Sequence, residues 1–334
     1  MRCLTLALAL RSKGAEVIFI CRDFKGALHE KLQAIGFQVS ILPHNDLASG
    51  SQAFSGRLRH HEWLGDDERS DASDTLLILQ KERAFDWLVT DHYGIGKIWH
   101  QTIRPANSKI FVIDDLADRE HDCDLLLDQS YFGKHKLSRY VNKVPPHCKT
   151  LIGPNYSLLR PEFNDQVVKP SAPNNPIRKL FINFGGIDKP DMTSRVLETL
   201  LPVLPSGVRV DVVASSLNPQ LEKIARVCQE HQLSLHIDSD EMAGLMRNAD
   251  LAIGCGGVVA IERAFIRLPS IVIANAFNQQ KSLQDMASSG LVSLLDNIDQ
   301  LPACFGSMLK NGAPPVKAVV KNGTQSVINY MTHQ

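Results

Sequence analysis

The sequence predicts an α/β protein made of two Rossmann-like domains with parallel sheets. Short β-branched and aromatic runs alternate with helical segments along nearly the whole chain, and such alternation produces parallel sheets through right-handed crossovers. A proline- and asparagine-rich stretch, NDQVVKPSAPNNPIRK, interrupts the alternation from position 164 and is typical of a linker. We therefore expect domains at 1–165 and 179–334, joined by a linker at 166–178 and facing each other across a central cleft.

Two interpretations compete for the first residues, MRCLTLALALRSKG. Arg2 and the apolar run after it match the start of a secretory signal peptide, although no small-residue cleavage site follows. A helix accounts for more of the segment, because Leu and Ala favour helices and because Arg11, Lys13 and Gly14 suit a helix C-terminus. We favour the helix, followed directly by the strand EVIFIC at 16–21.

Further elements follow in order along the first half. The segment 27–36 predicts a helix closed by Gly36, and FQVSIL at 37–42 predicts a strand. A polar stretch from 43 to about 70 precedes a helix expected near 75–83. Three more strands are predicted in the first half at 86–91, 109–115 and 123–128, and six in the second half at 180–184, 208–215, 233–237, 249–254, 269–275 and 291–295.

The composition excludes several classes of protein. Lys plus Arg equals Asp plus Glu at 36 each, so no basic field attracts nucleic acid or an acidic membrane. No apolar stretch reaches the roughly 20 residues that span a bilayer. The 7 cysteines are scattered without a CxxC pair, which argues against a disulfide framework or a zinc site and predicts a cytoplasmic protein.

Two glycine-rich turns stand where ligands bind in open α/β sheets, beyond the carboxyl ends of strands. FGGID carries Gly185 and Gly186; GCGGVVAIER carries Gly254, Gly256, Gly257 and Glu262. Paired glycines let backbone N–H groups approach a phosphate, and the helix that follows adds its dipole. A tight turn without a ligand explains each stretch equally well, and the residues alone leave this choice open.

Three further stretches carry polar side chains at strand ends. TDHYGIG holds Asp91, His92 and Tyr93, which suit proton transfer or hydroxyl recognition, or else cap the next helix. IDDLADREHDCDLLLDQS clusters carboxylates with His121, but their spacing matches no standard ligand set, so we expect no metal. The amides of FNQQ, from 277 to 280, suit sugar hydroxyls or a helix cap.

Taken together, these stretches resemble the PseG family, the UDP-2,4-diacetamido-2,4,6-trideoxy-β-L-altropyranose hydrolases of pseudaminic acid biosynthesis. MRCLTLA, DHYGI, DDLADREHDCDLLLDQS, GPNYSLLRPEF, NFGGID, GCGG and NQ occur in the family's order. The resemblance implies a GT-B-like fold, UDP in the C-terminal domain, the sugar facing the N-terminal one, and attack of water at the anomeric carbon with inversion. It implies no cofactor and no obligatory metal, and a product used in flagellin glycosylation. The alternatives are a MurG-type glycosyltransferase and an inactive nucleotide-sugar-binding remnant.

The family's site residues map onto matching positions of this chain. The resemblance makes Tyr93 and Asn278 catalytic, the five glycines and Glu262 ligands of UDP, and Arg2, Asp91 and Gln279 contacts of the substrate. The chain departs from the pattern at Gly96, at Ile261 and at its start. The family's first strand, glycine loop and GHV histidine would precede Met1, so we expect that strand to be missing and consider His92 as a replacement base.

Overall fold

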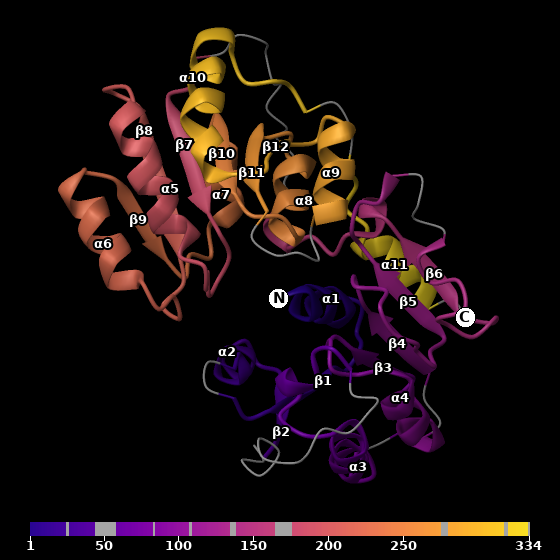
Figure 1. Cartoon of the computed structure of the whole chain (residues 1–334). Coiled ribbons are helices and arrows are strands. Elements are labelled where there is room, and N and C mark those ends of the chain that lie inside the picture. Colours follow the sequence, from indigo (N-terminus) through magenta and orange to yellow (C-terminus); the bar gives the residue numbers. More distant parts are fainter. Residues whose placement is uncertain are drawn as a thin grey trace. The chain divides into compact units, whose positions relative to one another are not determined.

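The computed structural model describes residues 1–24, 27–43, 58–82, 84–106, 109–133, 138–163, 176–274, 280–316 and 320–332. These residues fall into two compact units (Figure 1). The first comprises Met1–Gln129, Lys134–Leu158 and Gly323–Gln334, and the second comprises Ser130–Gly133 and Leu159–Asn322. Both contain parallel sheets and helices, so the predicted α/β class with two parallel-sheet units is confirmed.

The units differ from the predicted domains at the C-terminus. Helix α11 (Thr324–Thr332) belongs to the first unit and not to a domain at 179–334. Its apolar residues Val327, Ile328 and Met331 share a buried cluster with Leu6, and the indole of Trp87 donates a hydrogen bond to the Met331 carbonyl oxygen at 2.9 Å. Burial of this apolar face explains why the chain returns to the first unit.

The units also differ from the prediction where the chain enters the second unit. Leu159 and Phe163, predicted in the first domain, are buried in the core of the second. Ser130–Gly133 also belong to the second unit, where the Tyr131 hydroxyl donates to the Ser289 hydroxyl at 2.5 Å. Most of the predicted linker at 166–178 lies outside the described residues.

The first unit holds two separate parallel sheets, one of β1 and β2 and one in the order β3-β4-β5-β6. Strand β6 was not predicted, because its sequence KTLI is short and lacks a clear pattern. The bounds are α1 (Arg2–Arg11), β1 (Ile18–Arg22), α2 (His29–Ala34), β2 (Gln38–Leu42), η2 (His61–Trp63), α3 (Glu68–Leu79), β3 (Trp87–Thr90), α4 (Lys97–Ile103), β4 (Lys109–Ile113), β5 (Leu125–Asp128) and β6 (Lys149–Ile152).

Local chemistry accounts for the helix ends of this unit. The predicted N-terminal helix forms as α1, and Gly14 after it has a φ of 85°. The helix expected near 75–83 begins earlier, at Glu68, because the Asp67 carboxylate accepts hydrogen bonds from the backbone N–H groups of Arg69 and Ser70. Such an N-cap satisfies donors that have no partner within the helix.

The second unit is one six-stranded parallel sheet in the order β12-β11-β10-β7-β8-β9. Side chains alternate between its faces, so Leu180 and Ile182 join one buried cluster and Phe181 joins the other. Helices α5, α6 and α10 cover the first face, and α7, α8 and α9 cover the second (Figure 1). The bounds are β7 (Lys179–Asn183), α5 (Met192–Leu200), β8 (Arg209–Ala214), α6 (Leu221–Glu230), β9 (Ser234–Ile237), α7 (Met242–Asn248), β10 (Leu251–Gly254), α8 (Val258–Phe265), β11 (Ser270–Ile273), α9 (Gln280–Ser288), β12 (Ser293–Leu295) and α10 (Leu301–Asn311).

Two general findings bear on function. Among the described residues, no helix combines the length and the apolar character needed to cross a bilayer. All seven cysteines are free thiols. Neither the first nor the second unit is therefore held together by a disulfide.

Candidate functional site

The two glycine-rich turns of the second unit leave the same edge of the sheet. Strands β7 and β10 are parallel neighbours, with Asn183 opposite Gly254. The turn after β7 leads to α5 and the turn after β10 leads directly to α8. Gly185 and Gly257 have φ angles of 87° and 77°, and residues other than glycine rarely adopt such positive φ values. The predicted turns therefore form side by side, each ahead of a helix N-terminus.

Gly254 is required by close packing. A Cβ atom there would lie 2.3 Å from the carbonyl oxygen of Asn183 and 2.5 Å from Nη1 of Arg263. The Arg263 side chain is fully buried, and its Nη2 donates a hydrogen bond to the carbonyl oxygen of Cys255 at 2.6 Å. The guanidinium thus binds the backbone of the second turn.

Glu262 lies on α8 and is 3% exposed. Nε and Nη2 of Arg160 each donate a hydrogen bond to its carboxylate, both at 3.0 Å. Burial raises the pKa of Glu262, and the charge of Arg160 opposes that rise. Arg160 lies in GPNYSLLRPEF, one of the stretches that carry the resemblance, but it was given no role there, and it stands 102 positions from its partner. The ribose-binding role expected of Glu262 remains a prediction.

Two side chains hold the ends of the first turn: the Asn183 side-chain oxygen accepts a hydrogen bond from the Gly185 N–H at 3.3 Å, and Asp188 binds the start of α5. The Asp188 carboxylate accepts hydrogen bonds from the backbone N–H groups of Met192 and Thr193 at 3.0 and 2.8 Å and from the Thr193 hydroxyl at 2.6 Å. Gly186 between these anchors is exposed, and a Cβ atom built on it would meet nothing within 4 Å. Backbone N–H groups in an open turn with fixed ends are suited to an anion.

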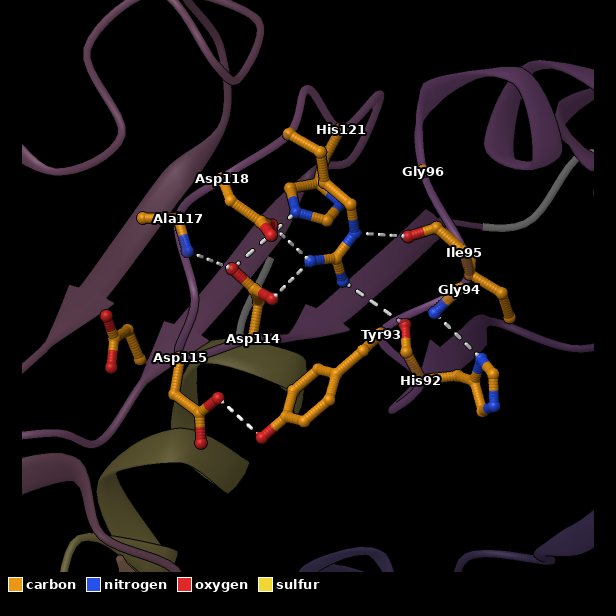
Figure 2. A network of polar contacts seen from close by, with 12 residues as sticks. His92, Tyr93, Gly94, Ile95, Gly96, Asp114, Asp115, Ala117, Asp118 and His121 are labelled. Atoms are coloured by element: carbon orange, nitrogen blue, oxygen red, sulfur yellow. Dashed lines mark hydrogen bonds and ion pairs between the residues drawn. The ribbon is translucent and has the colours of Figure 1, made fainter. Parts of the chain in front are cut away.

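In the first unit, four polar residues meet beyond the ends of β3 and β4, and three of them were predicted as site residues. Arg2 binds the Asp91 carboxylate through Nε and Nη2 at 2.9 and 2.7 Å, and its Nη1 reaches Asp115 at 3.0 Å. The Tyr93 hydroxyl donates to the other oxygen of Asp115 at 2.6 Å (Figure 2). The structure thus brings Arg2, Asp91 and Tyr93 together and adds Asp115, while their roles toward a substrate remain predictions.

Charges in this cluster determine which groups keep their protons. Burial and the nearby carboxylate of Asp115 raise the pKa of Tyr93, so its hydroxyl is a hydrogen-bond donor at neutral pH. Burial alone would lower the pKa of Arg2, but the charge of Asp91 and its hydrogen bond raise the pKa well above its ordinary value. The cluster therefore presents a fixed cation, two carboxylates and a neutral phenol.

His92 has both ring nitrogens engaged. Nδ1 accepts a hydrogen bond from the backbone N–H of Gly94 at 3.0 Å, which leaves Nε2 to donate to the carbonyl oxygen of Trp63 at 3.1 Å. Burial lowers the pKa of His92, which favours this neutral tautomer. The geometry favours a role in holding the backbone over the role of replacement base.

Arg119 anchors the segment that carries His92 and Tyr93. Its guanidinium donates to the carbonyl oxygens of Ile95 and His92 at 2.7 and 3.2 Å and pairs with the Asp114 carboxylate at 2.9 Å. Burial alone would raise the pKa of Asp114, but His121 and Arg119 hold it well below its usual range. Neither Arg119 nor Asp114 was singled out from the sequence, although both lie in the acidic stretch considered for a metal.

The remaining predictions concern metal binding and the NQ pair. Within the parts of the chain that the structure describes, no three His, Cys, Asp or Glu side chains are grouped to hold a metal ion. Several carboxylates of the stretch from 113 to 130 instead pair with arginines, as Asp122 and Asp124 do with Arg104. Asn278 and Gln279 lie outside the described residues.

No family model matches the chain, but several known proteins are similar to it. The chain is 29% identical over 219 residues to UDP-2,4-diacetamido-2,4,6-trideoxy-beta-L-altropyranose hydrolase of Campylobacter jejuni. This alignment covers 64% of this chain and 76% of that protein. The chain is 23% identical over 291 residues to the spore coat polysaccharide biosynthesis protein SpsG of Bacillus subtilis, covering 85% and 75% of the two chains.

Solved structures establish the fold. MurG of Acinetobacter baumannii superposes with a TM-score of 0.61 at 12% identity, covering 100% of this chain and 95% of that one. LpCGTa, determined in complex with UDP, gives the same TM-score and identity over 98% and 94% of the two chains. The chain therefore has the GT-B fold.

Proposed function

Because the chain is PseG-like, we propose that it is a UDP-sugar hydrolase. The proposed substrate is UDP-2,4-diacetamido-2,4,6-trideoxy-β-L-altropyranose, and the proposed reaction is attack of water at the anomeric carbon with inversion, releasing UDP. The pair of anchored glycine turns in the second unit is the observation that carries this proposal.

UDP is a good leaving group, so the protein mainly has to neutralise the charge that grows on the diphosphate. The turns after β7 and β10 supply backbone N–H groups and the N-terminal ends of α5 and α8 at one sheet edge. The Glu262 carboxylate has lone pairs that Arg160 does not use, and with these it would accept hydrogen bonds from the ribose hydroxyls. Gly185, Gly186, Gly254, Gly256 and Gly257 form the proposed diphosphate-binding turns.

The sugar is assigned to the polar cluster of the first unit. Arg2 and Tyr93 offer donors, and Asp91 and Asp115 offer acceptors, for the amides and hydroxyl of the sugar. The ion pairs and the hydrogen bond within this cluster fix the positions of its side chains, which lowers the cost of orienting the substrate. The role expected of Asn278 and Gln279, as catalytic and substrate-binding amides, remains part of the proposal.

The nucleotide assignment is tested by adding one methyl group to the turn. Gly186→Ala meets no protein atom within 4 Å, so it leaves the fold intact but obstructs approach of a phosphate to the backbone. We expect UDP affinity, measured by titration calorimetry, to fall at least about tenfold, or 1.4 kcal/mol. The matched control is Gly306→Ala on α10, where the added methyl also meets nothing within 4 Å. Equal UDP affinity for both variants would contradict the assignment.

The reaction itself is tested by incubating the protein with the UDP-sugar. We expect UDP and the free sugar in equal amounts, with the inverted anomer seen by NMR before it equilibrates. The GT-B fold shared with MurG supports a glycosyltransferase as the second candidate function. Transfer of the sugar to an added acceptor, without release of the free sugar, would favour that candidate, and UDP binding without turnover would favour an inactive nucleotide-sugar-binding protein.

A further inference from the structure

An exposed group of aromatic rings stands beside the polar cluster of the first unit. Trp63, at the end of η2, is 54% exposed. Its ring centroid lies 4.7 Å from that of His60 and 5.9 Å from that of Tyr93, and the His60 and Tyr93 centroids are 5.6 Å apart. The exposed indole therefore has ring surface available for a ligand next to a candidate binding residue.

The backbone that presents Trp63 is fixed to the segment that carries Tyr93. A Cβ atom at Gly94 would lie 2.9 Å from the carbonyl oxygen of His60, so the two segments are in direct backbone contact. His92 completes the attachment, since Nε2 donates to the Trp63 carbonyl oxygen and Nδ1 accepts from Gly94. The rings therefore keep their positions relative to the Tyr93 hydroxyl.

We propose that Trp63, His60 and Tyr93 form an aromatic platform that takes the apolar side of the substrate's sugar. This inference rests on the proposed function. The face of an aromatic ring is electron-rich and attracts the C–H groups of a stacked partner. A 2,4,6-trideoxy sugar with two acetamido groups carries three methyl groups, two on the amides and one at C6, and so exposes more apolar surface than an ordinary hexose.

The neighbouring polar residues complement such a ligand. The Tyr93 ring belongs to the platform while its hydroxyl bonds Asp115, which in turn binds Arg2. A sugar whose methyl groups and C–H groups lie on the rings would turn its amide and hydroxyl groups towards these donors and acceptors. Sites for small molecules combine aromatic walls with a few polar groups in this way.

The test compares Trp63→Ala with Trp63→Phe in the full chain, using UDP-2,4-diacetamido-2,4,6-trideoxy-β-L-altropyranose and UDP as probes. We expect Trp63→Ala to raise KM for the UDP-sugar about tenfold, to change kcat little and to leave the Kd of UDP unchanged. Trp63→Phe should restore most of the affinity, because a phenyl ring still offers an aromatic face. Leu77→Ala on α3, where Leu77 is 58% exposed, is the matched control and should change neither constant.

A fluorescence titration provides a second readout. Saturating UDP-sugar should alter the emission of the wild-type protein, UDP alone should not, and Trp63→Phe should abolish the change. Unchanged KM in Trp63→Ala, or an equal loss of affinity for UDP and for UDP-sugar, would overturn the platform while leaving the hydrolase function standing. A wild-type protein that binds UDP but neither binds nor turns over the UDP-sugar would instead overturn the proposed function, and the platform for this substrate with it.

Discussion

Removing the positive charge that faces Glu262 should destabilise the second unit in a pH-dependent way. Arg160→Met keeps much of the side-chain stem but leaves a carboxylate that is 3% exposed without its bidentate partner. Breaking a buried ion pair from one side costs about 3–5 kcal/mol. Because the Arg160 side chain is itself 19% exposed, we expect the lower limit, about 3 kcal/mol.

The cost should show in calorimetric melting. A loss of about 3 kcal/mol corresponds to a midpoint lowered by roughly 6–12 °C for a unit of this size. The matched control is Lys281→Met, which removes a surface ion pair with Asp285 in the same unit. Exposed pairs contribute about 0–1 kcal/mol, so this variant should melt within a few degrees of the wild type.

The pH dependence identifies Glu262 as the cause. Burial raises the folded-state pKa of Glu262, so the folded protein binds the proton more tightly than the unfolded chain, and stability falls as pH rises from the unfolded pKa through the folded one. Loss of Arg160 raises the folded pKa further, so the penalty should be smaller at pH 5 than at pH 8. Adding Glu262→Gln to Arg160→Met should recover stability at pH 8. A penalty independent of pH, or no larger than that of Lys281→Met, would refute the reasoning.

Two other predictions follow from the packing and the charges. Gly254→Ala should destabilise the second unit by several kcal/mol in urea denaturation, since its methyl would meet the Asn183 carbonyl oxygen at 2.3 Å, and stability equal to that of Gly306→Ala would contradict this. Asp114→Asn should lower stability at pH 7, where the depressed pKa of Asp114 stabilises the fold. That stabilisation is lost as pH falls below the unfolded value of about 3.9, so a denaturation series should show the difference shrinking at low pH; a constant difference would exclude Asp114 as its source.

Most strands and the two glycine-rich turns could be predicted from the sequence because their signals are local. Runs such as KIFVI and LFIN combine β-branched and aromatic residues, and the glycines after β7 and β10 mark tight turns within a few residues of each strand end. Asp91 and Tyr93 directly follow one strand, at the carboxyl end where ligands bind in parallel sheets, and the resemblance assigns both to the substrate site. The same argument applied to KIFVIDD would have added Asp115, whose carboxylate was instead weighed as part of a metal cluster.

The residues that were not predicted depend on distant partners. Nothing near Glu262 in the sequence indicates Arg160, and the return of α11 to the first unit depends on the tertiary burial of Val327 and Met331. Trp63 stands in a three-residue helical turn within a polar stretch, where no periodicity marks it. Pattern analysis detects elements that repeat, whereas these contacts form only once the chain has folded.

His92 illustrates why a motif has to be interpreted through its hydrogen bonds. From DHYG alone, a histidine beside a tyrosine at a strand end is a reasonable general base. A base needs a free lone pair directed at its proton, and in the structure the lone pair on Nδ1 is occupied by the N–H of Gly94 while Nε2 is bonded to the Trp63 carbonyl oxygen. The carboxylates of Asp91 and Asp115 retain acceptor sites beyond those taken by Arg2 and Tyr93. Among the described residues of the first unit, these two carboxylates are therefore better suited than His92 to direct a water molecule.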